Sequence, residues 1–147
     1  MLYADRYTSA VLTLMAGLSL AACGGTEAKA AKVAPAHVEH IEGSELSRVT
    51  LTPKAAERLD IKTEQVQEMV LGGTKRKVVP YGSVLYDARG NTWVYTSPAP
   101  LVFLRHAIHI EYISGERAVL SEGPPAGTAV VTFGAAELFG AEFEIGH

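Results

Sequence analysis

The sequence predicts a small, mainly antiparallel β domain, either a barrel or a sandwich, with one or two short helices. Its 147 residues are enough for one domain with its own core, but not for two large domains with a cleft between them. Runs rich in Val, Ile, Thr, Tyr and Phe recur about every 8–15 residues, and most are separated by short segments with Gly, Pro or Asn. This spacing is typical of consecutive hairpins in an antiparallel sheet.

The first elements are expected just after residue 48. Residues 49–51 alternate between apolar and polar, which predicts a strand. Thr52 is a good helix N-cap, and Pro53 suits the first helical position, so a helix of about two turns should follow over residues 54–59. Residues 61–66 return to alternation and predict another strand.

The clearest β pattern is a hairpin whose strands, 83–86 and 92–96, flank the loop 87–91. Trp93 and Tyr95 should then face one side of the sheet, and Val94 the other. A turn is expected at 71–74, and Pro80 should lie at the beginning or the edge of a strand, because proline cannot donate a ladder hydrogen bond. The remaining expected elements are strands over 101–112, 117–121 and 128–133, and a short helical piece over 135–138.

The amino end combines a short apolar run with the only cysteine of the chain. Residues 1–22 contain a short apolar run that suits a signal peptide better than a permanent membrane span. The residues Leu20-Ala21-Ala22-Cys23 resemble the lipobox, in which the cysteine is lipid-modified and becomes the first residue of the mature chain. Gly24 follows Cys23 where an Asp would signal inner-membrane retention, so the resemblance favours the outer membrane. We expect residues 23–47 to be a flexible tether and residues 48–147 to be the folded domain.

Composition excludes several function classes. Thirteen Lys and Arg against sixteen Asp and Glu give a net charge of -3, which argues against a nucleic-acid partner. A single cysteine excludes disulfides and the common zinc-finger and redox motifs. The sequence has no nucleophile elbow, zinc-protease motif, P-loop or dinucleotide fingerprint, so we expect neither an enzyme nor a bound cofactor.

Two groups of residues are candidates for binding. The cations Lys75, Arg76 and Lys77 are adjacent, and with Arg89 and Arg105 they are candidate contacts to a partner, although the sequence favours a solvated strand edge that the three adjacent cations guard against aggregation. His37 and His40 are three residues apart, beside Glu39 and Glu42, and could share a helical face that holds a divalent metal. The histidines available to such a metal-binding lipoprotein are His37, His40, His106, His109 and His147.

An ordered series of segments resembles a known transport family. Residues 79–86, 90–95, 103–110 and 127–138 look like the carboxyl-terminal region of periplasmic adaptor subunits, the membrane fusion proteins of RND-type efflux pumps, especially their heavy-metal-efflux branch. Residues 49–63 are similar to the segment that opens those adaptors. The family carries a lipoyl-like domain, an α-helical hairpin and a β-barrel domain between these two regions, whereas here only about residues 65–76 separate them. Pro124-Pro125 is a second departure from the family, which usually has an apolar residue directly after the position of Gly123.

The resemblance implies a membrane-proximal β domain built from both ends of the chain. It implies a non-enzymatic, lipid-anchored protein on the periplasmic face of a bacterial membrane that assists export, with metal ions among the substrates to consider. Its partners would be an inner-membrane RND transporter or a full-length adaptor, contacted through an exposed strand edge or loop. The alternative is the small periplasmic metal-binding lipoprotein described above.

Overall fold

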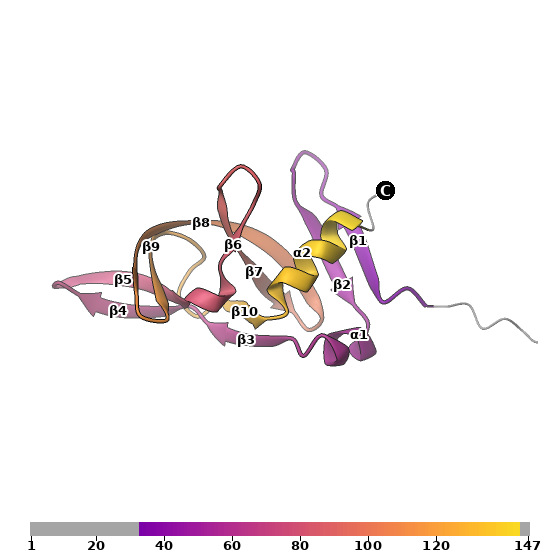
Figure 1. Ribbon diagram of the computed structural model, residues 1–147, viewed down its shortest axis with the longest axis horizontal. Coiled ribbons are helices and arrows are strands. Elements are labelled where there is room, and N and C mark those ends of the chain that lie inside the picture. The colour runs from indigo at the N-terminus through magenta and orange to yellow at the C-terminus, as the bar shows by residue number, and fades with distance from the viewer. Residues whose placement is uncertain (1–32, 145–147) are drawn as a thin grey trace, which may run out of the picture. The chain divides into compact units, whose positions relative to one another are not determined.

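The computed structural model describes residues 33–144, which form an antiparallel sheet with two helices (Figure 1). The predicted signal peptide, Cys23, the first part of the expected tether and His147 lie outside the described residues. The elements are β1 (Ala36–His40), β2 (Ser47–Leu51), α1 (Pro53–Arg58), β3 (Lys62–Gln65), β4 (Gln67–Leu71), β5 (Thr74–Pro80), the 3-10 turn η1 (Tyr81–Ser83), β6 (Leu85–Tyr86), β7 (Thr92–Ala99), β8 (Val102–Ser114), β9 (Arg117–Glu122), β10 (Ala129–Phe133) and α2 (Ala135–Glu144).

The sheet curls so that its two ends are consecutive in the chain. Its main path runs β3-β10-β7-β8-β9-β5-β4, while β2 pairs with β8, β1 with β2, and β6 with β7. Only the buried Val66 separates β3 from β4, and its N–H donates to the Thr128 carbonyl while its own carbonyl accepts from Gly127 N–H. The predicted class, a small antiparallel β domain with short helices, is therefore confirmed.

The long strand β8 connects the two parts of the sheet. Its first half pairs with β2 and β7, and residues from His109 onward pair with β9. Register shifts between His109 and Tyr112 mark where the strand passes from one set of partners to the other. The segment around residues 49–63 and the hairpin around Trp93 therefore belong to one sheet, because β2 and β7 are neighbours of the same strand.

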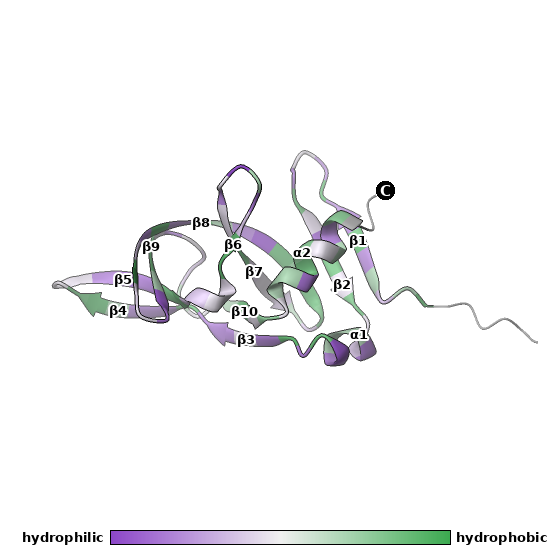
Figure 2. Cartoon of the chain, in the orientation of Figure 1, coloured by the Kyte–Doolittle hydropathy of each residue, from purple (hydrophilic) through white to green (hydrophobic). Residues whose placement is uncertain are grey.

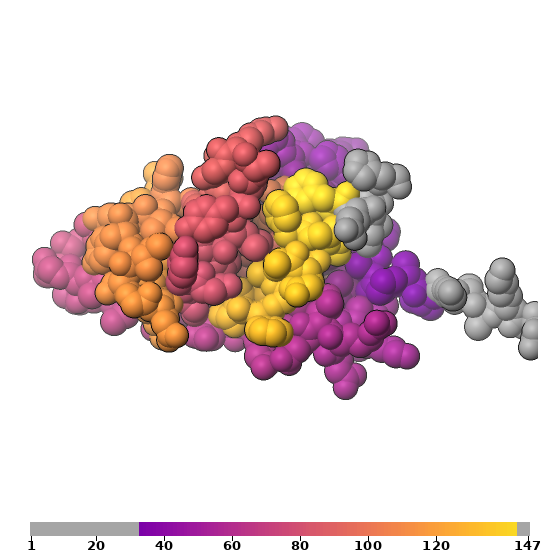
Figure 3. All heavy atoms as spheres, viewed as in Figure 1, coloured from indigo at the N-terminus to yellow at the C-terminus, as the bar shows by residue number. Residues whose placement is uncertain are grey.

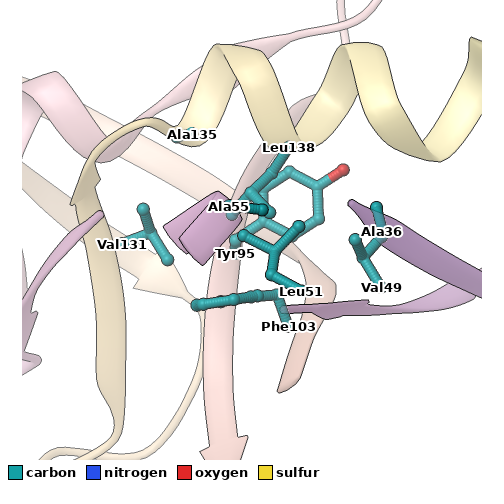
Figure 4. Packing of buried hydrophobic residues seen from close by; sticks show 9 residues of the cluster. All are labelled: Ala36, Val49, Leu51, Ala55, Tyr95, Phe103, Val131, Ala135 and Leu138. Carbon is teal, nitrogen blue, oxygen red and sulfur yellow. The ribbon is translucent and has the colours of Figure 1, made fainter. Parts of the chain in front are cut away.

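Two hydrophobic clusters cover the two faces of β7 and β10. Tyr95 and Val131 belong to the first cluster, which α1, α2 and the β1–β2 hairpin cover, and Val94 and Val130 belong to the second, on the other face. This alternation confirms the predicted facing of Val94 and Tyr95. Figure 4 shows the side chains of the first cluster, which are Ala36, Val49, Leu51, Ala55, Tyr95, Phe103, Val131, Ala135 and Leu138.

Local sequence signals explain where both helices begin. The Thr52 hydroxyl accepts a hydrogen bond from Ala55 N–H at 3.2 Å, and Pro53 is the first residue of α1, as predicted. Gly134 precedes α2 with a φ of 84°, and a Cβ there would clash with the Ile61 side chain. The predicted helical piece 135–138 is only the first part of α2, which continues to Glu144.

Part of the expected tether belongs to the domain instead. Residues 36–40 form β1, which pairs residue by residue with β2 from Ala36↔Leu51 to His40↔Ser47. Ala36 is buried in the first cluster and Val38 packs against it. Two small apolar side chains at alternate positions are enough to hold β1 on the sheet, because its partner strand β2 is itself paired with β8. The boundary predicted at residue 47 therefore differs from the structure, in which the sheet begins at residue 36.

The surroundings of Pro80 agree with one of the two predicted positions, whereas Ser83 differs from expectation. Pro80 is the last residue of β5, and it pairs with Arg117 of β9 beyond the point where β4 ends, so it has a strand neighbour on one side only. Its missing N–H therefore leaves no gap in the β4–β5 ladder. Ser83, expected in a strand, closes the turn η1, where its hydroxyl donates to the Pro80 carbonyl at 2.6 Å. The hairpin strand β6 is accordingly shorter, although it pairs with β7 as predicted.

Candidate docking surface

The β4–β5 hairpin carries the predicted cation cluster and ends in a tight turn. Leu71 and Thr74 are paired, so the turn consists of Gly72 and Gly73 alone, with φ angles of 58° and 78°. A two-residue turn with both φ angles positive matches the right-handed twist of a hairpin, and glycine adopts it without strain. The turn therefore holds the two strands in a fixed register at the end of the sheet opposite the β1–β2 hairpin (Figure 1).

Apolar side chains are exposed on the outer strand of this hairpin. Val70 is 68% exposed and Met69 is 42% exposed, and Figure 2 shows this part of β4 as hydrophobic beside the more hydrophilic β5. Among residues 33–144, β4 has only β5 as a strand neighbour. Because the residues that flank a two-residue turn form a hydrogen-bonded pair, the backbone groups of Glu68 and Val70 point away from β5. The hairpin thus offers an open strand edge together with apolar side chains.

Each of the three adjacent cations has a partner inside the domain. Lys75 Nζ lies 2.9 Å from Glu68, whose hydrogen bond and charge raise the pKa of the lysine. Arg76 lies 3.0 Å from Glu111. The solvated cluster expected from the sequence is therefore partly neutralised by carboxylates of β4 and β8.

Lys77 differs from its two neighbours because its partner is a backbone carbonyl. Its Nζ donates to the Gly123 carbonyl at 2.5 Å, which leaves the positive charge without an acidic partner there. Burial and then the positive charge of Lys77 lower the pKa of His106. Lys77 is thus the residue of the cluster that keeps a net positive charge on the hairpin.

Arg89 lies on another loop, the tip of the β6–β7 hairpin. Asp87 organises this loop by accepting hydrogen bonds from the backbone N–H groups of Arg89 and Asn91, from the Asn91 amide and from Trp93 Nε1. The Asn91 amide, with Trp93 and the two backbone donors, lowers the pKa of Asp87 to about 2. Arg89 and Phe143 line a groove of about 440 Å³ beside this loop, separate from the β4–β5 hairpin.

Arg105 is not a surface contact, contrary to the prediction. It is 5% exposed, and its Nε lies 2.8 Å from Glu142 of α2. The guanidinium stacks 4.6 Å from the Trp93 ring and 5.1 Å from the Phe143 ring, and it also bonds the Glu45 carbonyl. Its charge is therefore used to hold α2 and the β1–β2 loop on the sheet.

Glu142 is the centre of this buried polar network. Its carboxylate accepts the Tyr95 hydroxyl at 2.5 Å and the Ser47 N–H at 3.3 Å as well as Arg105. Burial and then the contact with Glu142 raise the pKa of Tyr95 far above its ordinary value. The role of Glu142 was not predicted from the sequence, because a single Glu near the end of a short helical pattern carries no signal that its partner lies 37 residues earlier.

The histidines are not arranged as a metal site in the described part of the chain. His37 and His40 lie on a strand, where residues three apart point to opposite faces, so they do not share the face that a helix would have given them. Among residues 33–144 there is no group of three or more His, Cys, Asp or Glu side chains placed to hold a metal ion. The same part of the chain has no helix long and apolar enough to cross a membrane.

Comparisons with known proteins add one solved structure. No protein-family model matches the chain, and no curated protein matches it. The chain is similar to the NMR structure of the N-terminal metal-binding site and membrane-proximal domain of SilB from Cupriavidus metallidurans CH34, at 23% identity and a TM-score of 0.44. The match covers 52% of this chain and 42% of that one. A likeness at this level establishes neither the fold nor the function of this chain.

Proposed function

We propose that this protein is a non-enzymatic periplasmic lipoprotein of the RND-efflux adaptor type. It docks through the β4–β5 hairpin on an inner-membrane transporter or on a full-length adaptor, and Cys23 anchors it to the membrane. Acyl chains at Cys23 would raise its effective concentration beside membrane partners. Docking then needs only a modest interface.

The observation that carries the proposal is the joining of the two adaptor-like regions in one domain. The region 49–63 contributes β2, α1 and the start of β3, while the region 79–138 contributes most of the other strands. β2 pairs with β8, and Leu51 and Ala55 share a core with Tyr95 of the second region. A collinear resemblance split over two separate segments is expected to describe one domain only if these segments pack together, and they do.

The geometry of the hairpin supports it as the docking surface. β4 has an open edge for a strand of the partner, and the exposed Val70 and Met69 can enter apolar pockets between the partner's side chains. Figure 3 shows the hairpin projecting from the domain, where a partner can reach it.

A capture experiment tests this proposal. The full chain, tagged at its carboxyl end, is expressed in its own bacterium and purified in mild detergent, and the captured pump components are quantified by mass spectrometry. We expect an RND transporter or adaptor to be captured, and we expect Val70→Asp to reduce the captured amount at least about tenfold by placing a charge in an apolar contact. Val33→Asp is the matched control, because Val33 is 80% exposed and lies far from the hairpin in the chain.

The capture experiment has three outcomes, and each leads to a different conclusion. Capture of a pump component that Val70→Asp removes and Val33→Asp preserves supports docking through the hairpin. Capture that both variants preserve contradicts the hairpin as the docking surface, and the absence of any pump component contradicts the proposed function itself.

A further inference from the structure

The strand β1 has one side without a neighbour. It pairs only with β2 among the described residues, and β2 lies between β1 and β8. Thr52 N–H donates to the Pro35 carbonyl and Ile41 N–H donates to the Leu46 carbonyl, at the two ends of the β1–β2 ladder. Because hydrogen-bonded positions alternate in an antiparallel pair, His37 and Glu39 bond β2 through their backbones. The backbone groups of Ala36, Val38 and His40 therefore point to the open side.

The open edge is complementary to itself. In an antiparallel pairing about Val38, that residue lies opposite Val38 of a second copy, and Ala36 lies opposite His40. His37 then lies directly opposite Glu39 of the second copy, and the same contact occurs twice by symmetry. Both contacts fall at non-hydrogen-bonded positions, where opposite side chains are closest and interact most strongly.

We propose that two copies of this chain associate by antiparallel pairing of their β1 strands, with Val38 on the two-fold axis. The pairing satisfies the outward backbone groups of both strands and adds two contacts between an imidazole and a carboxylate. His37 makes no side-chain hydrogen bond or ion pair with another residue between 33 and 144. Glu39 bonds Arg48 through Oε2 at 3.0 Å, so its other oxygen stays available.

The other edges of the described sheet are less suited to self-pairing. β3 carries Lys62 and Glu64, but Lys62 already bonds Asp60 and lies over the Phe133 ring. The register of β3 against β10 also shifts at Lys62, which bends that edge. β4 would place Glu68 opposite the apolar Val70, and β6 has only two residues. The charge pattern thus selects β1.

The test is the oligomeric state of the full chain, measured by sedimentation equilibrium in a density-matched non-ionic detergent from about 10 μM to about 1 mM. We expect a reversible monomer–dimer equilibrium. The variant His37→Glu places two carboxylates opposite each other at both contacts, and we expect it to raise the dissociation constant about tenfold. The double variant His37→Glu with Glu39→His restores opposite pairs and should return the constant to within about threefold of the original value.

A second variant tests the backbone pairing independently of charge. Val38→Pro removes an N–H that points away from β2, so the β1–β2 ladder should remain while the pairing on the two-fold axis is lost. We expect this variant to be monomeric with an unchanged circular dichroism spectrum. His109→Glu is the matched control for the charge change, because His109 is an exposed strand residue away from β1.

The proposal is contradicted if the chain is monomeric throughout the concentration range. It is equally contradicted if a dimer forms that neither Val38→Pro nor His37→Glu weakens, because the association would then use another surface, such as the leader segment. A dimer weakened by both variants and unaffected by His109→Glu supports pairing through β1, whatever the outcome of the capture experiment on the β4–β5 hairpin.

Discussion

Removing the carboxylate of Glu142 should destabilise the domain more than any exposed substitution. The side chains of Glu142 and Arg105 are only 2% and 6% exposed, so solvent screens their interaction little. In the variant Glu142→Leu, the Arg105 guanidinium stays buried without its anionic partner, and the Tyr95 hydroxyl and the Ser47 N–H lose their acceptor. Breaking one side of a buried ion pair costs about 3–5 kcal/mol. We expect a loss of that size in the free energy of unfolding.

The loss is large relative to the whole domain and easy to observe. A domain of this size is stable by about 5–15 kcal/mol, so a large part of the total would disappear. Trp93 is the only tryptophan of the chain, and its ring lies 4.6 Å from the Arg105 guanidinium. Urea unfolding followed by the fluorescence of Trp93 therefore reports on the network itself. The free energy is obtained from the midpoint and the slope of each transition.

Two controls decide whether the ion pair is the cause. The double variant Arg105→Met with Glu142→Leu also removes the buried guanidinium, so it should recover the part of the loss that comes from the unpaired charge, while the Tyr95 hydroxyl and the Ser47 N–H still lack their acceptor. Glu137→Leu makes the same substitution at an exposed position of α2, and it should change the stability by less than about 1 kcal/mol. If Glu142→Leu loses less than about 1 kcal/mol, or if the double variant is as unstable as the single one, the buried pair does not hold α2 as argued.

Two further predictions concern Asp87 and Cys23. The pKa of Asp87 is lowered to about 2, so its contribution to stability is complete above the ordinary carboxyl pKa of about 4 and is lost as the pH falls through about 2. The difference in urea midpoint between the original chain and Asp87→Asn should therefore shrink from pH 5 to pH 2, and a difference that stays constant would show that the carboxylate is not responsible. Cys23→Ala should abolish labelling by radioactive palmitate, and a variant that is labelled as strongly as the original chain would contradict Cys23 as the lipid anchor.

The sequence was informative wherever the determinants are local. The cap Thr52 and the residue Pro53 begin α1 as expected, and the loop 87–91 joins the strands of the predicted hairpin. Turn residues and alternation act over a few positions, so they can be interpreted without the rest of the chain. The strands β1 and β4 were not predicted, because β1 is mostly polar and β4 has two polar residues followed by three apolar ones instead of an alternation, and such edge strands form beside a partner strand.

The candidate surface was only partly predictable for the same reason. Lys75, Arg76 and Lys77 could be found as a cluster. The pairing of Lys75 with Glu68 and of Arg76 with Glu111 depends on strand register, which the sequence does not show. Arg105 was taken for a surface residue because its partner Glu142 belongs to a helix far along the chain. Charge by itself therefore does not distinguish a docking residue from one that holds the interior together.

The two-glycine turn between β4 and β5 is a place where a longer segment could be inserted into the domain. A Cβ added at Gly72 or Gly73 would meet no atom within 4 Å, so nothing packs over the bend that they make. A chain cut there and fitted with a long helical insert should keep its interior, which makes this bend a suitable grafting point for an element that reaches farther from the domain.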